Sequence, residues 1–187
     1  MELDLDKLIY LDSEFISRKY EELKDYNPST QITKSEGFKG GISAGFLSAG
    51  ANTQETRTFM ISSHKMLKEL WDTLKSLYKT FDETSFQNYK GTEITWLSGD
   101  LTIAEWSSQR QEKGYEFYQL DHHNKKRTAF LTHREYFSAG FDEVFNASVA
   151  LKGNIGIPVI CLARIMWHVD QAENYTACPY IIMEVGS

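Results

Sequence analysis

The chain has 187 residues, of which 41% are hydrophobic, 13% aromatic and 25% charged. This composition is typical of a folded globular protein rather than a disordered one, and the length fits one domain over residues 1–187. The formal net charge of −6 would repel a phosphate backbone, so nucleic acid is a disfavoured partner.

The chain lacks the signals that direct a protein into or across a membrane. No stretch reaches the roughly 18 apolar residues of a membrane span. The start, Met-Glu-Leu-Asp-Leu-Asp, is acidic and has neither the positive region nor the long apolar region of a signal peptide. We therefore expect a cytoplasmic protein with no membrane partner.

The first elements that the sequence predicts are a strand and a helix. The apolar run over 7–11 predicts the strand, and Asp12 or Ser13 can cap the helix by accepting a hydrogen bond from its first turn. We expect the helix to end by Asn27, because Pro28 disfavours a helical residue before it. The apolar residues at helical spacing are Ile16, Tyr20 and Leu23.

A glycine-rich segment follows over 29–57. Small residues four apart allow a closely packed helix, whereas alternation around Ile42 indicates a strand. Because glycine costs a helix interior about 1 kcal/mol, we favour strands or a mobile hairpin. The Gly-Lys-Ser/Thr ending of a phosphate loop is absent. We expect the segment to order on contact with a partner or a second copy, through Phe38, Ile42, Phe46 and Leu47.

The clearest element is a helix capped by Ser62 or Ser63 and running to about Phe81. Eight large apolar residues form one stripe, with lysines and acids opposite. Such a stripe indicates the side of a main helix that faces the core, and a partner-binding face is the alternative. The stripe consists of Met66, Leu67, Leu70, Trp71, Leu74, Leu77, Tyr78 and Phe81.

The second half of the chain predicts mostly strands. An antiparallel meander is expected, with a turn at Ser98-Gly99-Asp100 and a basic hairpin loop at Lys125-Lys126-Arg127. The fold class that we predict is α+β, an antiparallel meander or partly open barrel packed with one main helix and two shorter helices. The expected strands are 93–97, 101–106, 115–120, 128–132, 157–169 and 175–185, and the last short helix is 142–151.

Aromatic residues on the meander are candidates for a ligand site, because their faces stack planar ligands and tyrosine adds a hydrogen-bonding group. The alternative is that they alternate between core and surface. The candidates are Trp96, Trp106, Tyr115 and Tyr118.

A carboxylate and two imidazoles adjoin at Asp121-His122-His123, and histidine can act as a metal ligand or general base. Neighbouring strand residues point to opposite faces, so these histidines are more simply a solvated turn. No HExxH, paired-cysteine or GxSxG motif occurs, so we expect no metal and no cofactor. Cys161 and Cys178 lie in apolar runs and are interpreted as reduced core thiols.

The order of short motifs resembles an uncharacterised bacterial family of unknown function. The motifs are Tyr10-Leu11-Asp12, a helix, the glycine-rich stretch 37–51, the Leu/Trp helix, a meander and the strand 157–164. The resemblance implies a prokaryotic or phage cytosolic protein from a mobile or defence-linked gene neighbourhood, and it transfers no catalytic residue.

Our hypothesis from the sequence is a non-enzymatic binding or accessory protein. Its expected partner is another protein, a second copy in a homo-oligomer, or a small ligand. The alternative is a small hydrolase or transferase that uses His122, His123 or His133 with Asp121. That alternative requires these side chains to converge in space.

Overall fold

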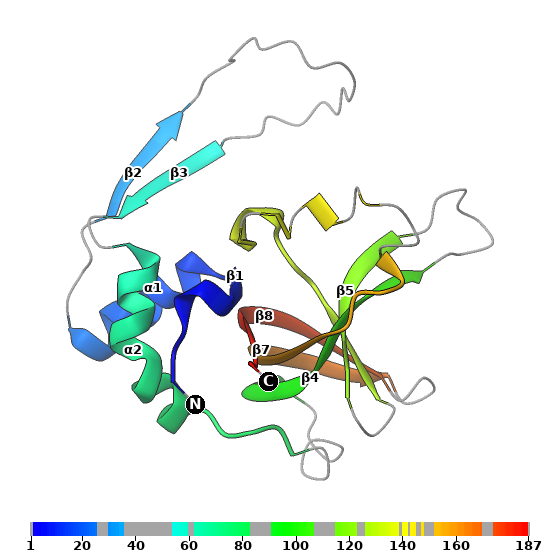
Figure 1. Cartoon of the computed structure of the whole chain (residues 1–187). Coiled ribbons are helices and arrows are strands. Elements are labelled where there is room, and N and C mark those ends of the chain that lie inside the picture. The colour runs from blue at the N-terminus through cyan, green and yellow to red at the C-terminus, as the bar shows by residue number, and fades with distance from the viewer. Residues whose placement is uncertain are drawn as a thin grey trace, which may run out of the picture.

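A computed structural model describes most of the chain, and it contains two helices and two separate sheets within the described residues (Figure 1). The described residues are 2–25, 30–35, 54–59, 62–82, 91–106, 115–122, 126–138, 140–141, 143–144, 147, 152–169 and 174–186. The helices are α1 (Ser13–Lys24) and α2 (Ser63–Leu77), and the short 3-10 turns are η1 (Leu5–Lys7) and η2 (Arg134–Tyr136). The strands are β1 (Leu8–Leu11), β2 (Thr30–Ser35), β3 (Gln54–Phe59), β4 (Glu93–Trp106), β5 (Tyr115–Asp121), β6 (Arg127–Phe130), β7 (Ile157–Val169) and β8 (Asn174–Glu184).

Both long helices begin at residues that the sequence predicts. The Asp12 carboxylate accepts a hydrogen bond from the Phe15 N–H at 2.8 Å, and the Ser62 hydroxyl accepts one from the Lys65 N–H at 3.3 Å. Each cap satisfies a backbone donor that has no partner within its helix. α1 ends at Lys24, before the expected limit, and Asp25 follows in the left-handed conformation with φ 49°.

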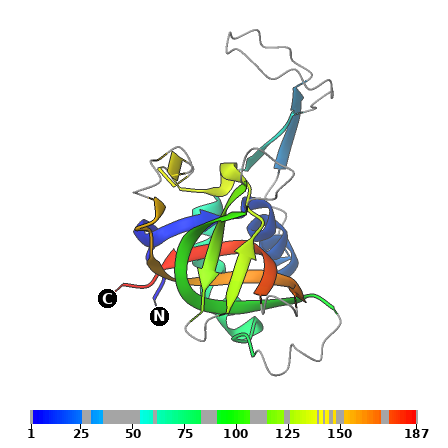
Figure 2. The ribbon, with the colours of Figure 1, turned by 90° about the vertical axis from the view of Figure 1, so that its right-hand side faces the viewer.

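The larger sheet folds back on itself as a partly closed ring. Its strand order is β1-β8-β6-β5-β4-β7, and β7 also pairs with β8, so that β4, β5, β6, β8 and β7 form the ring (Figure 2). The meander β4-β5-β6 and both C-terminal strands confirm the predictions, and the α+β class is confirmed. Only the β6–β8 pair is parallel among the pairings of the described strands. The expected helix at 142–151 falls mostly outside the described residues.

The predicted turn at Ser98-Gly99-Asp100 is wrong, because β4 continues through it as one strand. The first part of β4 pairs with β7 and the second with β5, and the two ladders overlap at Asp100 and Leu101. A Cβ atom at Gly99 would overlap the backbone carbonyl oxygen of Asp121. Gly99 therefore allows a close backbone approach inside a strand instead of a chain reversal.

α2 is shorter than its apolar stripe predicts. It ends at Leu77, and the following residues lie extended beside β4, with a parallel bridge between Thr80 and Trp96. Met66, Leu67, Leu70, Trp71 and Leu74 are buried, which confirms the core-facing interpretation for this part of the stripe, whereas Leu77 is 49% exposed.

Apolar side chains form two cores, one on each face of the ring. The interior holds residues such as Leu101, Tyr118 and Phe130. The outer core lies between the sheet and the helices and includes Leu70 and Tyr180. Figure 1 shows α1 and α2 together beside the ring.

The two cysteines are free, as predicted, and they lie on opposite faces of the sheet. Cys161 belongs to the interior core, where complete burial raises the pKa of its thiol. Cys178 follows the interior residue Ala177 on β8, so its side chain points to the outer face. A disulfide between them is therefore excluded by geometry.

The second sheet contains only β2 and β3, which pair antiparallel from Thr30 with Phe59 to Ser35 with Gln54. These strands confirm the strand interpretation for the two ends of the glycine-rich segment. Figures 1 and 2 both show this sheet standing away from the ring and the helices. Within the described chain, no helix has both the length and the apolar character to cross a membrane.

Candidate functional site

Four of the predicted contact residues lie outside the described residues, so their prediction is untested. They are Phe38, Ile42, Phe46 and Leu47. Their segment begins and ends in the two-stranded sheet, immediately after Ser35 and before Gln54.

The predicted aromatic ligand site does not form as one surface, because Trp96 and Tyr118 lie in different cores. Trp96 belongs to the outer core, where its ring meets that of Trp71 edge-on at 5.6 Å and its Nε1 donates to the Leu74 carbonyl at 3.4 Å. Tyr118 is fully buried inside the ring, and its hydroxyl donates to the Phe141 carbonyl at 2.6 Å. Two buried side chains on opposite faces of a sheet cannot stack on the same ligand.

The remaining aromatic candidates, Trp106 and Tyr115, are directly paired at the far ends of β4 and β5. Their backbone position is described and their side chains are not. They lie at the other end of β4 from Trp96, which is separated from Trp106 by ten residues of strand. The sequence places all these aromatics on one meander, but the length of β4 separates Trp96 from the paired Trp106 and Tyr115.

The Asp121 and His122 side chains take part in structural contacts at the hairpin between β5 and β6. The Asp121 carboxylate accepts from Gln119 Nε2 at 2.6 Å and lies 3.6 Å from Arg127 Nε. His122 Nε2 and Thr128 Oγ1 are 2.7 Å apart, and the His122 N–H donates to the Lys126 carbonyl at 2.8 Å. These contacts confirm a hairpin at the basic loop. His123 lies outside the described residues.

His133 lies far from His122 along β6. His122 precedes the start of this strand, and His133 follows its end. The His133 side chain is 71% exposed, with Nδ1 3.8 Å from Glu135. The described part of the chain holds no group of three or more His, Cys, Asp or Glu residues that could bind a metal. The described histidines therefore do not provide the convergence that the enzyme alternative needs.

A groove beside Trp96 is an apolar candidate for a ligand site. It encloses about 340 Å³ at the C-terminal end of α2. The chain after α2 forms one wall, because the Trp96 N–H donates to the Lys79 carbonyl at 2.9 Å and the Phe81 N–H donates to the Trp96 carbonyl at 2.8 Å. The lining residues are Lys75, Tyr78, Thr80, Trp96, Leu97, Ser98 and Ile160.

The described lining of this groove is mainly apolar and aromatic. Apolar and aromatic walls combine with hydroxyls, as in many small-molecule sites. Lys75, at the rim, lies 3.7 Å from Asp72 of its own helix. The described lining residues include no carboxylate, imidazole or thiol. Of the aromatic candidates whose side chains the structure describes, Trp96 lines the groove.

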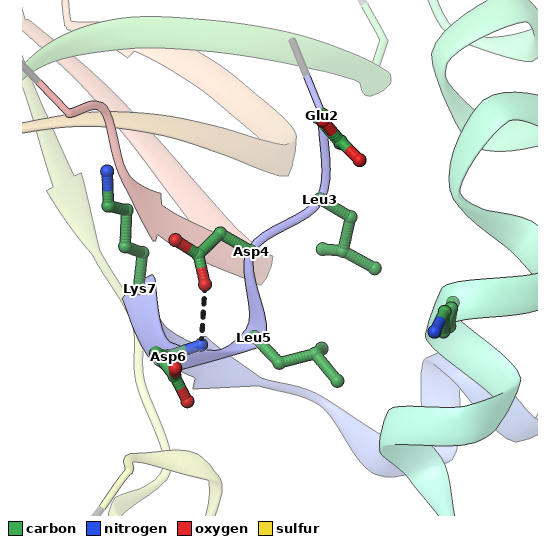
Figure 3. A pocket seen from close by; sticks show the side chains of 7 residues that line it. Glu2, Leu3, Asp4, Leu5, Asp6 and Lys7 are labelled. Carbon is green, nitrogen blue, oxygen red and sulfur yellow. Dashed lines mark hydrogen bonds between the residues drawn. The ribbon is translucent and has the colours of Figure 1, made fainter.

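Two other cavities are more polar. One encloses about 580 Å³ around residues 2–7 and Lys68. Figure 3 shows Leu3 and Leu5 pointing toward α2, while the Asp4 carboxylate accepts from the Asp6 N–H at 3.1 Å. The other, of about 220 Å³, lies between β1, η2 and the start of α2, with His64 and Glu135 in its lining.

No family model, no curated protein and no solved structure matches the chain. The resemblance to an uncharacterised bacterial family, and the origin that it implies, therefore stay predictions.

Proposed function

We propose that the chain is a non-enzymatic binding protein that recognises a protein partner by strand addition to the β2–β3 sheet. The observation that carries the proposal is the isolation of this sheet. Six residue pairs join β2 to β3, and in the described part of the chain neither strand pairs with a third.

The unpaired edges explain why this sheet suits a partner. Each strand of a two-stranded sheet directs half of its backbone N–H and C=O groups outward, where they can pair with an extended segment. An isolated two-stranded hairpin is only marginally stable in water, so a third strand adds both hydrogen bonds and stability. The sheet is therefore expected to be most stable when a strand of another chain pairs with one of its edges.

The predicted contact residues in 37–51 extend this proposal. Phe38, Ile42, Phe46 and Leu47 follow β2 and precede β3 in the sequence. In the proposed complex these side chains add apolar burial to the backbone pairing. The partner is another protein or a second copy of this chain.

Proline substitutions at two successive residues of β2 test the proposal. Successive residues of an antiparallel strand direct their N–H groups alternately toward the paired strand and outward, and proline has no N–H. One of Ile32→Pro and Thr33→Pro therefore disrupts the β2–β3 ladder, and the other removes a donor from the outer edge. Thr56→Pro and Arg57→Pro form the corresponding pair on β3.

The measurement is capture of partners from host extract, together with the oligomeric state of the purified chain. We expect wild-type protein to capture a defined partner or to self-associate. The partner pairs with one of the two strands. On that strand, the variant that lacks the outward N–H donor should no longer capture the partner or self-associate. Urea melts of the ring should stay unchanged. Equal capture and equal association by all four variants would contradict the proposal.

A second candidate function is small-ligand binding in the groove beside Trp96. It is favoured by a volume of about 340 Å³ and by the walls formed by Tyr78 and Ile160. Indole, a planar apolar probe, should shift the NMR signals of both residues. Ser98→Phe, which fills the groove from an exposed position, should abolish the shifts. Unchanged shifts in this variant would exclude the groove as the binding site.

A further inference from the structure

The two strands of the β2–β3 sheet carry different charges. β2 has one charged residue, the base Lys34, whereas β3 has one acid and one base, Glu55 and Arg57. The other residues of both strands are uncharged. β3 is therefore the strand that can place opposite charges against a copy of itself.

The two charged residues of β3 occupy the same face of the sheet. Residues two apart in a strand share a face, and Thr56 between them belongs to the other face. Inside the sheet, the register pairs Glu55 with Lys34 and Arg57 with Ile32. On its other side β3 has no strand partner in the described part of the chain, and the sheet stands away from the ring (Figure 1). This outer edge is thus the place where a further strand can pair.

Symmetry restricts how the outer edge of β3 can pair with the same edge of a second copy. In an antiparallel pair of identical strands, a two-fold axis perpendicular to the sheet relates the two copies. The axis passes through a position where one residue faces its own copy. The residue before this position then faces the residue after it in the second copy. Each possible register can therefore be judged by the charges that it places opposite one another.

Among the registers of β3 with its own copy, the one centred on Thr56 pairs opposite charges. It places Glu55 opposite Arg57 of the second copy, and symmetry repeats this pair on the other side of the axis. Registers centred on Glu55 or on Arg57 place like charges opposite each other. Opposite charges at directly opposing positions stabilise a strand pair, whereas like charges destabilise it. The charges of β3 therefore favour one register.

The edge of β2 fits a second copy less well. Because Lys34 is its one charged residue, no register of β2 with its own copy pairs a base with an acid. Pairing β2 with β3 of a second copy can oppose Lys34 and Glu55. That contact joins two different edges, however, and continues from copy to copy without closing. Pairing β3 with itself closes as a dimer.

We infer that the partner in strand addition is a second copy of this chain, and that the two copies pair through the outer edges of β3 in the register centred on Thr56. The inference rests on the proposed function, since it names the occupant of the sheet edge proposed there. The dimer contains a four-stranded sheet in the order β2-β3-β3-β2. The net charge of −6 on each copy opposes association, so the attraction between Glu55 and Arg57 acts locally at the interface.

Charge reversal at the two positions tests the inference on the full chain, with sedimentation equilibrium as the measure of the dimer Kd. Glu55→Arg places an arginine opposite Arg57 of the second copy, and Arg57→Glu places a glutamate opposite Glu55. Each variant replaces two favourable pairs with two unfavourable ones. We expect either variant alone to dimerise at least about tenfold more weakly than wild type.

An equimolar mixture of the two variants is the deciding measurement. One chain then carries two bases at the interface and the other carries two acids, so both pairs in a mixed dimer are of opposite charge. We expect a one-to-one heterodimer although neither variant dimerises well alone. Glu55→Arg also stands opposite Lys34 in its own sheet. That change is present with and without the second variant, so recovery in the mixture reports on the interface.

Lys34→Gln is the control, because it removes the charge of β2, which lies one strand away from the interface, and it should dimerise like wild type. Equal urea melts of the ring show that every variant is folded. The inference is overturned if wild type stays monomeric at about 1 mM, where even weak interfaces associate. It is also overturned if the single variants dimerise like wild type, if the mixture stays monomeric, or if the copies form open-ended assemblies.

The proposed function is judged separately, by capture from host extract. A wild-type chain that stays monomeric but captures another protein, and loses it on a proline substitution at an outer edge, keeps strand addition and overturns the second copy as its partner. A monomeric chain that captures nothing overturns both.

Discussion

The ring and the β2–β3 sheet differ in how many of their strand edges are paired. Strands lie on both sides of β4, β5, β6, β7 and β8. The outer side of β1 is partly covered, because Phe137 forms an antiparallel bridge with Tyr10 and the Ser138 N–H donates to the Ile9 carbonyl. In the described residues, β2 and β3 have one partner each. Because most strand edges of the ring are paired, whereas β2 and β3 have one described partner each, we assign the proposed strand addition to the smaller sheet.

The two regions also differ in where their stability originates. The ring is packed on its interior face by one apolar core and on its outer face by a second core beneath α1 and α2. The β2–β3 sheet stands apart from both (Figure 1). The comparison predicts that changes in the two cores unfold the protein, and that changes in β2 or β3 alter only its contacts.

The largest effect is expected from Leu70→Ala or Leu74→Ala. Both side chains are fully buried, so each truncation removes apolar contacts and leaves a cavity, at a cost of about 2–5 kcal/mol. Urea melts measure the loss. Leu77→Ala is the control, because Leu77 is 49% exposed on the same helix and should lose less than about 1 kcal/mol. Small losses at both buried sites would mean that α2 serves a partner rather than the core.

Gly99→Ala tests the closure of the ring. The added Cβ meets the Asp121 carbonyl oxygen, which belongs to the backbone of the neighbouring strand, and we expect a loss of about 1–3 kcal/mol. Gly156→Ala is the matched control, since a Cβ there has nothing within 4 Å. Equal stability of the two variants would show that β4 does not need the close approach at Gly99.

The sequence predicts the outer layer of this fold better than its closure. Asp12 and Ser62 are recognisable caps, and the stripe through Leu70 gives α2, because these signals depend on residues within a few turns of one another. The glycine at position 99 resembles a turn signal and instead lies inside β4, where it allows the close approach of a neighbouring backbone. Only the position of the Asp121 carbonyl, 22 residues away in the sequence, distinguishes the two.

The candidate sites were less predictable because they also depend on contacts between segments that are distant in the sequence. Trp96 and Tyr118 both belong to apolar alternating runs, and the sequence does not say which face of the sheet becomes the interior of the ring. The placement of both Tyr180 and Ile181 in the outer core depends on a bulge in β8, and the packing of α1 on the sheet includes the stacking of Phe15 on Tyr180. Neither feature has a motif, because both arise when distant segments pack.

His122 gives a smaller effect that corrects the interpretation of a fully solvated turn. Its Nε2 contacts the hydroxyl of Thr128, which is buried, so His122→Ala should cost about 1–2 kcal/mol by leaving that hydroxyl without its partner. His133→Ala, at a 71% exposed side chain, should change stability by less than about 0.5 kcal/mol. Thermal melts compare them. Loss of biological function in either variant with an unaltered melt would revive the enzyme alternative.

The smallest effect concerns Asp12, whose pKa is raised chiefly by burial and lowered in part by the N–H groups of Phe15 and Glu14. A raised pKa in the folded state means that the native protein binds the proton more tightly. The contribution of Asp12 protonation to the free energy of unfolding is therefore fully present below the ordinary pKa of an aspartate. It is lost as the pH rises through the pKa of Asp12 in the folded state. Asp12→Asn keeps a capping oxygen and cannot ionise.

We consequently expect Asp12→Asn to be slightly more stable than wild type at neutral pH and equal to it in acid. Urea melts across this range measure the difference. Ser62→Ala is the control, because it removes an uncharged cap and should cost about 0.5–2 kcal/mol at every pH. An advantage of Asp12→Asn that grows as the pH falls would contradict the expected sign.

Hydrogen exchange of the full chain, free at low concentration and bound to its partner or to a second copy, tests the central claim most directly. Our account predicts fast amide exchange in 30–35 and 54–59 in the free chain, selective slowing there on association, and strong protection of β7 and β8 in both states. Protection of β2 and β3 equal to that of β7 and β8 in the dilute free chain would contradict it.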